Sequence, residues 1–159
     1  MKPEVYVIGG PTASGKSKLA VELAKKNNGE IISADSMQIY KEMNIGTAKI
    51  TKEEMQGIKH YLIDIVSPNE RYSVSNFKND AELAIEEILK KGKTPIIVGG
   101  TGLYIDSLIY GIEFQDEEID TEYREKLNKI AENEGLEKLY NKAKEIDPEA
   151  MKKISINDK

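Results

Sequence analysis

The sequence predicts an α/β fold in which helices flank a parallel sheet, with a small helical appendage at the C-terminal end. Two glycine-rich turns, at residues 10–15 and 99–102, each follow a short apolar run and precede a helical pattern. Short apolar strands alternating with helices are typical of parallel α/β sheets. From residue 113 the chain instead becomes acidic and then carries two charged helical patterns. We therefore expect a core domain over residues 1–112 and a helical appendage over residues 113–159.

The first glycine-rich turn is a phosphate-binding P-loop. It lies between the apolar run 5–8 and a predicted helix over 16–26, and it reads Gly10, Pro11, Thr12, Ala13, Ser14, Gly15, Lys16, Ser17. Glycines let successive backbone N–H groups converge on one anion, and the following helix adds the positive end of its dipole. Lys16 supplies a mobile charge, and the Ser17 hydroxyl is a candidate Mg²⁺ ligand. The predicted sheet is therefore P-loop NTPase-like, and its ligand carries a diphosphate or triphosphate.

The remaining elements follow from hydrophobic spacing and capping residues. The first strand, 5–8, is expected to be central and buried on both faces. Further strands are predicted at 30–33, 60–66 and 94–98, and further helices at 37–41, 103–108, 121–133 and 136–146. Another helix is predicted between a cap at Ser73 or Ser75 and its end at Lys90-Lys91-Gly92, with an apolar stripe formed by Phe77, Ala81, Ala84, Ile85, Ile88 and Leu89. A loop with a short helix is expected between residues 44 and 57. Asp64, inside the third predicted strand, is the one candidate for the acid that many P-loop enzymes place after an apolar strand.

Two polar residues follow predicted strands and are candidate site residues. Asp35 comes just after the strand 30–33, and Thr101 lies in the glycine-rich turn after the strand 94–98. Because ligands collect at the carboxyl ends of parallel strands, both residues are expected to face the same crevice as the P-loop. Asp35 is also a candidate cap of the helix 37–41, and Thr101 a candidate cap of the helix that follows it. The capping and ligand-facing roles are compatible.

Three further features bear on function. His60, the single histidine, has no carboxylate partner evident from the sequence, which favours a structural role. Arg124 lies on a charged helix, and its spacing alone fits a solvated surface charge. The strand 94–98 is followed by Gly99, where a nucleotide hydrolase usually carries an acid that holds the magnesium water shell. This glycine argues against a motor or ATPase.

The composition of the chain narrows the functional classes that remain. The chain has 159 residues, a net charge of −5 and no cysteine. The absence of cysteine excludes disulfides and thiolate chemistry and is compatible with the cytoplasm. No run is long enough to span a bilayer, so no membrane association is expected. The acidic balance argues mildly against a nucleic-acid binder.

Taken together, the motifs resemble those of the tRNA dimethylallyltransferase (tRNA isopentenyltransferase) family. The resemblance runs from Val5 to the last residue, and its most specific parts are the P-loop, Ala34-Asp35-Ser36-Met37-Gln38-Ile39-Tyr40 and Gly99-Gly100-Thr101-Gly102-Leu103-Tyr104. It is also carried by Gly46-Thr47-Ala48-Lys49, His60-Tyr61-Leu62-Ile63-Asp64, Asp147-Pro148-Glu149-Ala150 and Asn157-Asp158. The family joins a dimethylallyl group from dimethylallyl diphosphate to N6 of an adenosine beside the tRNA anticodon, releasing diphosphate.

The resemblance implies a role for each candidate residue. The P-loop residues 10–17 would hold the donor diphosphate, with Mg²⁺ as cofactor bound through Ser17. Asp35 would be the general base, with Lys16 and Thr101 also catalytic. The residues that would contact tRNA are Asp35, Ser36, Met37, Gln38, Thr101 and Arg124. We expect a monomeric, cytoplasmic enzyme whose partners are tRNA and dimethylallyl diphosphate.

The resemblance also implies that this chain is shorter than family members, which continue into further, more basic helices. We therefore expect an amino-terminal portion of a longer enzyme that binds the donor but holds tRNA poorly. Three alternatives stay open: a P-loop small-molecule kinase, an adenylate isopentenyltransferase acting on free nucleotides, and a nucleotide-binding regulatory module. Preference for ATP would favour the kinase, and turnover with AMP or ATP as acceptor would favour the second enzyme. Unchanged activity of an Asp35→Asn variant would favour the regulatory module.

Overall fold

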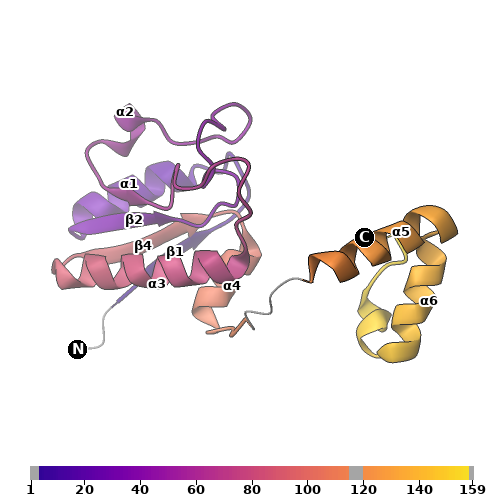
Figure 1. Ribbon diagram of the computed structural model, residues 1–159. Helices are drawn as coiled ribbons and strands as arrows, with labels where there is room; N and C mark the ends of the chain where they lie inside the picture. Colours follow the sequence, from indigo (N-terminus) through magenta and orange to yellow (C-terminus); the bar gives the residue numbers. More distant parts are fainter. Residues whose placement is uncertain (1–3, 115–119, 158–159) are drawn as a thin grey trace. The chain divides into compact units, whose positions relative to one another are not determined.

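The computed structural model describes residues 4–114 and 120–157. The chain forms two compact units, one ending at Phe114 and one beginning at Gln115. The first unit contains the sheet and the P-loop, and the second is helical (Figure 1). Within the described residues, no helix combines the length and the apolar character needed to cross a membrane.

The first unit is built on a four-stranded parallel sheet, which confirms the predicted α/β class. The strand order is β1-β4-β2-β3, and the strands are β1 (Tyr6–Gly9), β2 (Gly29–Ser33), β3 (His60–Tyr61) and β4 (Thr94–Gly99). Parallel neighbours require crossover connections, and here these contain the helices α1 (Lys16–Lys26), α2 (Lys52–Met55) and α3 (Val74–Lys90). A further helix, α4 (Gly102–Ile109), follows β4.

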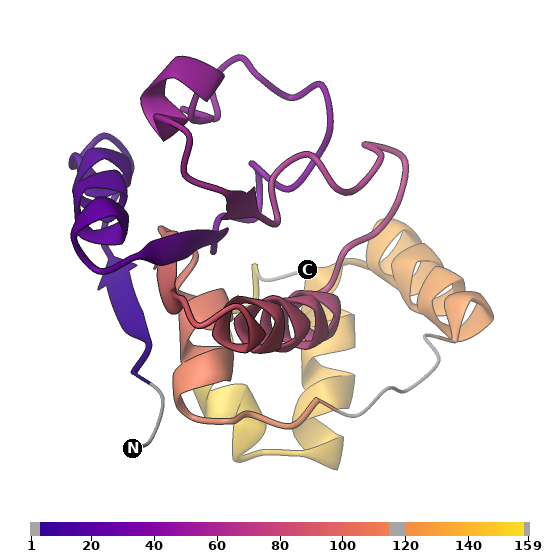
Figure 2. The same cartoon turned by 90° about the vertical axis from the view of Figure 1, so that its left-hand side faces the viewer.

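Helices cover both faces of the sheet, so the two central strands are buried on both sides. Ile31 of β2 and Ile96 of β4 pack with α1, whereas Ile32 and Ile97 pack with α3 and α4 on the other face (Figure 2). This alternation is the two-residue period of a strand, and adjacent isoleucines give each face of the sheet an apolar side chain. The stacked rings of Phe77 and Tyr104, whose centroids are 4.1 Å apart, join α3 to α4.

The helix α3 matches its prediction in position, cap and buried face. Ser73 Oγ accepts a hydrogen bond from Asn76 N at 3.1 Å, and Asn76 Oδ1 accepts one from Ser73 N at 2.9 Å. This reciprocal arrangement is a capping box, which satisfies two backbone donors that a helix start otherwise leaves free. The predicted apolar stripe is buried in the core at Phe77, Ala81, Ala84 and Ile88.

Two predicted elements are wrong in the same region. The strand predicted over 60–66 is only two residues long, because Leu62 and Asp64 adopt left-handed backbone angles, with φ of 60° and 57°. The segment 37–41, predicted as a helix, is a turn followed by a bridge between Tyr40 and Val66. The two errors have one cause. Backbone N–H groups of residues 64–66 donate to the carbonyls of Gln38 and Ile39, so each segment satisfies the other instead of extending a strand or a helix.

The predicted position of the first strand is also wrong, because β1 lies at an edge of the described sheet and not at its centre. Among the described residues its one neighbouring strand is β4. Val7 is 39% exposed, in contrast to the buried isoleucines of β2 and β4. An apolar run cannot distinguish a strand that lacks one neighbour from a fully enclosed one.

The second unit consists of α5 (Thr121–Glu134), α6 (Leu136–Ile146) and the short 3-10 helix η1 (Ala150–Lys153). The two α-helices have the predicted bounds to within one residue, whereas the 3-10 helix was not predicted. Tyr140 OH donates to the carbonyl of Met151 at 3.1 Å, which ties η1 to α6. Met151 is the one residue described as buried in this unit, so its core is thin.

Candidate functional site

The P-loop joins β1 to α1 and leaves the start of α1 open to a ligand. The N-cap residue of α1 is Gly15, with φ of 83°, and no side chain makes a cap hydrogen bond at this helix start. The first N–H groups of α1 are therefore available to a ligand. Lys16 Nζ donates to the carbonyl of Pro11 and to Ser14 Oγ, the latter at 3.4 Å. The ammonium group therefore rests on the loop itself. Together these groups form a concentrated positive site for an anion.

Asp35 follows β2 and organises the turn after it. Its Oδ1 accepts hydrogen bonds from Met37 N at 2.9 Å and Gln38 N at 3.3 Å. The side chain thus makes the predicted cap, although the segment it caps is a turn. Its second oxygen, Oδ2, has no hydrogen bond to the part of the chain that the structure describes. That oxygen is available to accept a proton or a hydrogen bond from a ligand.

The second glycine-rich turn packs directly against the Asp35 segment. Thr101 Oγ1 accepts a hydrogen bond from Ser36 N at 3.0 Å and donates one to Ser36 Oγ at 3.3 Å. Thr101 is the N-cap residue of α4, but its side chain makes no cap hydrogen bond. At Gly99, a Cβ atom would lie 2.0 Å from the carbonyl oxygen of Ala34. The close approach of the two strand ends therefore requires glycine where a hydrolase would carry an acid.

A third segment, residues 47–50, completes the site. Gln38 Nε2 donates to the carbonyls of Thr47 and Ala48, both at 3.2 Å. Lys49 Nζ donates to Tyr40 O at 2.8 Å and forms an ion pair with Asp64 Oδ1 at 2.6 Å. These contacts attach residues 47–50 to the Asp35 turn. They also show that the Asp64 carboxylate serves the loop, and Asp64 does not line the pocket that holds the P-loop.

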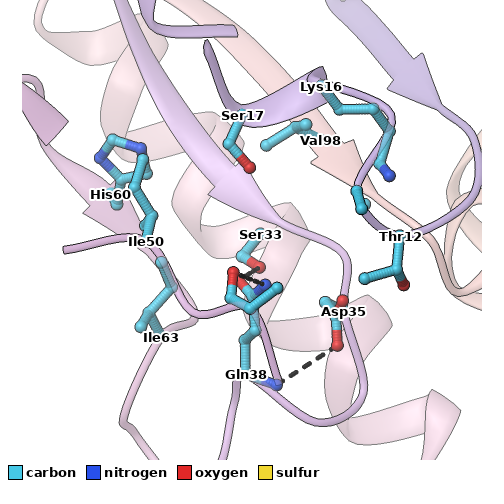
Figure 3. A pocket seen from close by; sticks show the side chains of 13 residues that line it. Thr12, Lys16, Ser17, Ser33, Asp35, Gln38, Ile50, His60, Ile63 and Val98 are labelled. Atoms are coloured by element: carbon cyan, nitrogen blue, oxygen red, sulfur yellow. Dashed lines mark hydrogen bonds between the residues drawn. The ribbon is translucent and has the colours of Figure 1, made fainter. Parts of the chain in front are cut away.

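One pocket lies between the P-loop, the Asp35 turn, residues 47–50 and the ends of β2 and β4 (Figure 3). Its polar side carries Thr12, Lys16 and Asp35, and its other side carries Ile50, His60 and Ile63. The remaining lining residues are Ala13, Ser17, Ser33, Gln38, Ala48, Val98 and Gly99. The pocket therefore offers a phosphate-binding group, a carboxylate and an apolar wall within one cavity.

The structure does not bring every predicted site residue into this pocket. Ser36, Met37 and Thr101 do not line it: Ser36 and Thr101 are hydrogen-bonded to each other, and Met37 is 45% exposed. Gly10, Pro11, Ser14 and Gly15 shape the P-loop without lining the cavity. Arg124 is exposed on α5 and belongs to the second unit. Of the residues proposed to contact tRNA, Asp35 and Gln38 line the pocket, and of the P-loop residues Thr12, Ala13, Lys16 and Ser17 do.

His60 lies in the pocket wall, a placement that sequence reasoning did not foresee. Its Nδ1 is 2.9 Å from the carbonyl of Ile58, so Nδ1 carries the proton and donates, leaving Nε2 as an acceptor. Burial lowers the pKa of His60 below its ordinary value, and the bond to Ile58 opposes that shift only in part. The imidazole is therefore neutral at pH 7 and presents one acceptor. Its position at the start of the predicted strand 60–66 gave no signal that it belongs to the site, because ligands are expected at the carboxyl ends of strands.

The site fits a magnesium ion held mainly by its ligand. Among the described residues, no group of three or more His, Asp or Glu side chains could hold a metal ion. The Ser17 hydroxyl lines the pocket next to the start of α1. Mg²⁺ is commonly bound by one protein oxygen together with phosphate oxygens and water, and Ser17 can supply that one ligand.

The fold and the pocket define a P-loop protein. The family model described as IPP transferase matches residues 38–159. The chain belongs to this family. Two similar curated proteins are tRNA dimethylallyltransferases, from Acetivibrio thermocellus (63% identical over 154 residues) and Caldanaerobacter subterraneus subsp. tengcongensis (59% over 158 residues). The matches cover 97% and 99% of this chain but 49% and 50% of those proteins, so the chain spans about half their length.

Solved structures confirm the fold. The full-length tRNA isopentenylpyrophosphate transferase from Bacillus halodurans matches 99% of this chain and 52% of its own, with 46% identity and a TM-score of 0.71. A eukaryotic dimethylallyltransferase described as acting on tRNA matches 99% of this chain and 39% of its own, with 37% identity and a TM-score of 0.76. The family resemblance expected from the motifs is confirmed, and so is the expectation that relatives are longer.

Proposed function

We propose that the complete protein transfers a dimethylallyl group from dimethylallyl diphosphate to N6 of an adenosine beside the anticodon of tRNA, releasing diphosphate. The observation that carries this proposal is the single pocket that joins a P-loop, the Asp35 carboxylate and an apolar wall. A phosphate site alone fits many reactions. A phosphate site facing both a free carboxylate oxygen and apolar surface suits a donor whose diphosphate is linked to a hydrocarbon.

The P-loop would bind and stabilise the leaving group. The N–H groups at the start of α1 and the Lys16 ammonium would hold the donor diphosphate, because its negative charge grows as the carbon–oxygen bond breaks. Magnesium, bound by Ser17 and the phosphate oxygens, would neutralise part of that charge. Lys16 would have to leave the carbonyl of Pro11 to reach the phosphates.

Asp35 would act on the acceptor. The exocyclic amine of adenine is a weak nucleophile, and it must lose a proton as the new carbon–nitrogen bond forms. Asp35 Oδ2 would take that proton while Oδ1 keeps the turn in place. The electron pair of the donor's carbon–oxygen bond leaves with the diphosphate, so charge and atoms balance. An adenosine must leave its stack to reach such a pocket, as in other enzymes that modify a base.

The remaining assignments belong to the same proposal. Ser36, Met37, Gln38, Thr101 and Arg124 would contact tRNA, directly or through the turn that they build. The enzyme would act as a monomer in the cytoplasm. Light scattering of the purified protein, with and without tRNA, measures the oligomeric state.

Calorimetry in the presence of Mg²⁺ tests the donor site. The complete protein should bind dimethylallyl diphosphate more tightly than ATP, and incubation with an anticodon stem-loop should add one dimethylallyl group by mass spectrometry. Tighter binding of ATP together with phosphoryl transfer would establish a small-molecule kinase. Prenylation of AMP or ATP, but not of the stem-loop, would instead establish an adenylate isopentenyltransferase.

A further inference from the structure

We propose that Ile50 limits the length of the isoprenoid chain that the donor pocket accepts, because it stands between that pocket and a second cavity. The inference rests on the proposed function, since it assumes a prenyl diphosphate at the P-loop. It assigns a role in substrate specificity to an apolar side chain in the pocket wall.

Two neighbouring cavities share one wall. The second cavity has a volume of about 250 Å³ and is lined by Ser17, Lys18, Ala48, Ile50, Glu54 and Gln56. Three of these residues, Ser17, Ala48 and Ile50, also line the P-loop pocket. Ser17 and Ala48 have small side chains, so Ile50 is the shared residue whose side chain fills space between the cavities.

The backbone on both sides of Ile50 is fixed. Before it, the Lys49 side chain is 6% exposed and bonds to Tyr40 O and Asp64 Oδ1. After it, Thr51 caps α2: Thr51 N donates to Glu54 Oε2 at 2.8 Å, and Glu54 N donates to Thr51 Oγ1 at 3.2 Å. Ile50 itself packs against the core cluster formed by α1, β2 and β4. The flanking contacts hold the backbone of Ile50, and its side chain can make room for a longer ligand only by giving up its packing against this cluster.

The chemistry of the donor gives the wall its function. With the diphosphate on Lys16 and Ser17, the hydrocarbon runs away from the P-loop and meets the apolar side of the pocket, where Ile50 lies. A five-carbon chain would end at this wall. A ten-carbon chain would need the volume behind it, in the second cavity. Apolar pockets discriminate by about 10- to 200-fold per methylene added or removed, so an occupied wall suffices for chain-length selection.

Substitution of Ile50 tests the proposal on the complete protein. Calorimetry with Mg²⁺ would compare dimethylallyl diphosphate, geranyl diphosphate and inorganic diphosphate. The unmodified protein should bind the dimethylallyl compound at least about 10-fold more tightly than the geranyl compound. Ile50→Ala should join the two cavities and bring the two affinities within about 3-fold, while inorganic diphosphate binding stays unchanged. Ile50→Val keeps the β-branched packing and should give an intermediate ratio, which tests the idea even if the alanine variant does not fold.

Two control variants locate the effect. Ile45→Ala changes a side chain that is 98% exposed in the same region, and it should leave the affinity ratio unchanged. Ile63→Ala enlarges the first pocket without opening the second, so it should not admit the geranyl chain. Equal binding of both prenyl compounds by the unmodified protein, or the same relaxation in Ile63→Ala, overturns the role of Ile50. Failure to bind dimethylallyl diphosphate at all overturns the proposed function instead.

Discussion

At the scale of single residues, Lys16 is the group that a bound donor would move. Its ammonium now lies on the carbonyl of Pro11, and a diphosphate would offer it a stronger, charged partner. A hydrogen bond to a charged group contributes about 1.5–3 kcal/mol, so Lys16→Ala should weaken diphosphate binding by about 10- to 100-fold. Titration calorimetry with dimethylallyl diphosphate measures this. Lys26→Ala, which removes an exposed lysine from the far end of α1, should leave the affinity unchanged.

Two replacements of Asp35 separate its role as a cap of the turn from its proposed role as a general base. Asparagine keeps an Oδ1 that can accept from Met37 N and Gln38 N, whereas alanine removes both the cap and the proposed base. Asp35→Asn should therefore lower turnover by about 10²–10⁴ with little change in donor affinity. Single-turnover kinetics with an anticodon stem-loop, beside donor calorimetry, measures both quantities.

The same pair of variants also identifies a purely structural role. If Asp35→Asn kept full turnover while Asp35→Ala lost it, the cap would be the function of the residue and the proposed base would be wrong. A parallel fall of donor affinity and turnover in Asp35→Asn would likewise contradict a base that acts on the acceptor.

At the scale of elements, an ion-pair network joins the ends of β2, α3 and β4 that lie away from the site. Glu30, only 4% exposed, accepts from Lys93 at 2.7 Å, Tyr61 at 2.8 Å and Lys91 at 3.2 Å. Burial alone would raise the pKa of Glu30, but these hydrogen bonds outweigh it and lower the pKa below its ordinary value. The carboxylate is therefore stabilised in the folded state.

Removing the Glu30 charge should destabilise the fold in a pH-dependent way. Because the folded pKa is depressed, the stabilisation is complete above the ordinary value of 4.5 and is lost as pH falls through the lower, folded value. Glu30→Gln should cost about 1–2 kcal/mol at pH 7, a modest figure since both lysines remain about one-third exposed. Urea unfolding at pH 7 and pH 3 measures the loss, which should shrink at pH 3. Glu86→Gln, in an exposed pair with Lys90, should cost less than about 0.5 kcal/mol at either pH.

Elements fixed by local signals were predictable, and those fixed by distant partners were not. The bounds of α1 and α3 follow from apolar spacing and capping residues within each segment. The segments 37–41 and 60–66 are apolar enough for regular structure, but their backbone groups pair with each other across about 25 residues of chain. In these two segments a tertiary contact outweighed the local preference for a helix or a strand. The position of β1 in the sheet likewise depends on which strands lie beside it, and this is not encoded within the strand itself.

At the scale of the whole molecule, the sequence predicts the polar part of the candidate site but not its apolar wall. The P-loop and Asp35 are contiguous motifs whose chemistry can be read directly. The apolar wall comes from Ile50 and Ile63, which are ordinary core residues in sequence and meet the P-loop only through folding. His60 was interpreted as structural because the sequence shows no carboxylate partner for it, and its place in the pocket wall follows only from the fold.

Arg124 belongs to the second unit, and its proposed role can be tested separately from the donor site. Arg124→Ala should weaken tRNA binding and reduce the salt dependence of binding by about one phosphate contact. It should leave the affinity for dimethylallyl diphosphate unchanged, because the donor pocket lies wholly in the first unit. Filter binding of tRNA across a salt series measures this on the complete protein. Lys129→Ala on the same helix is the matched control, and an equal effect of both variants would contradict a specific contact.

The contact between Gly99 and Ala34 sets a limit on how this protein can evolve. Any side chain at position 99 would collide with the Ala34 carbonyl, 2.0 Å from its Cβ, and would displace the segment that carries Asp35. The acid that a nucleotide hydrolase places after this strand and the carboxylate at Asp35 therefore exclude each other in this backbone. One mutation at this position cannot add such an acid while leaving Asp35 in its present place. The glycine thus ties the absence of a hydrolase-type acid after β4 to the present position of Asp35.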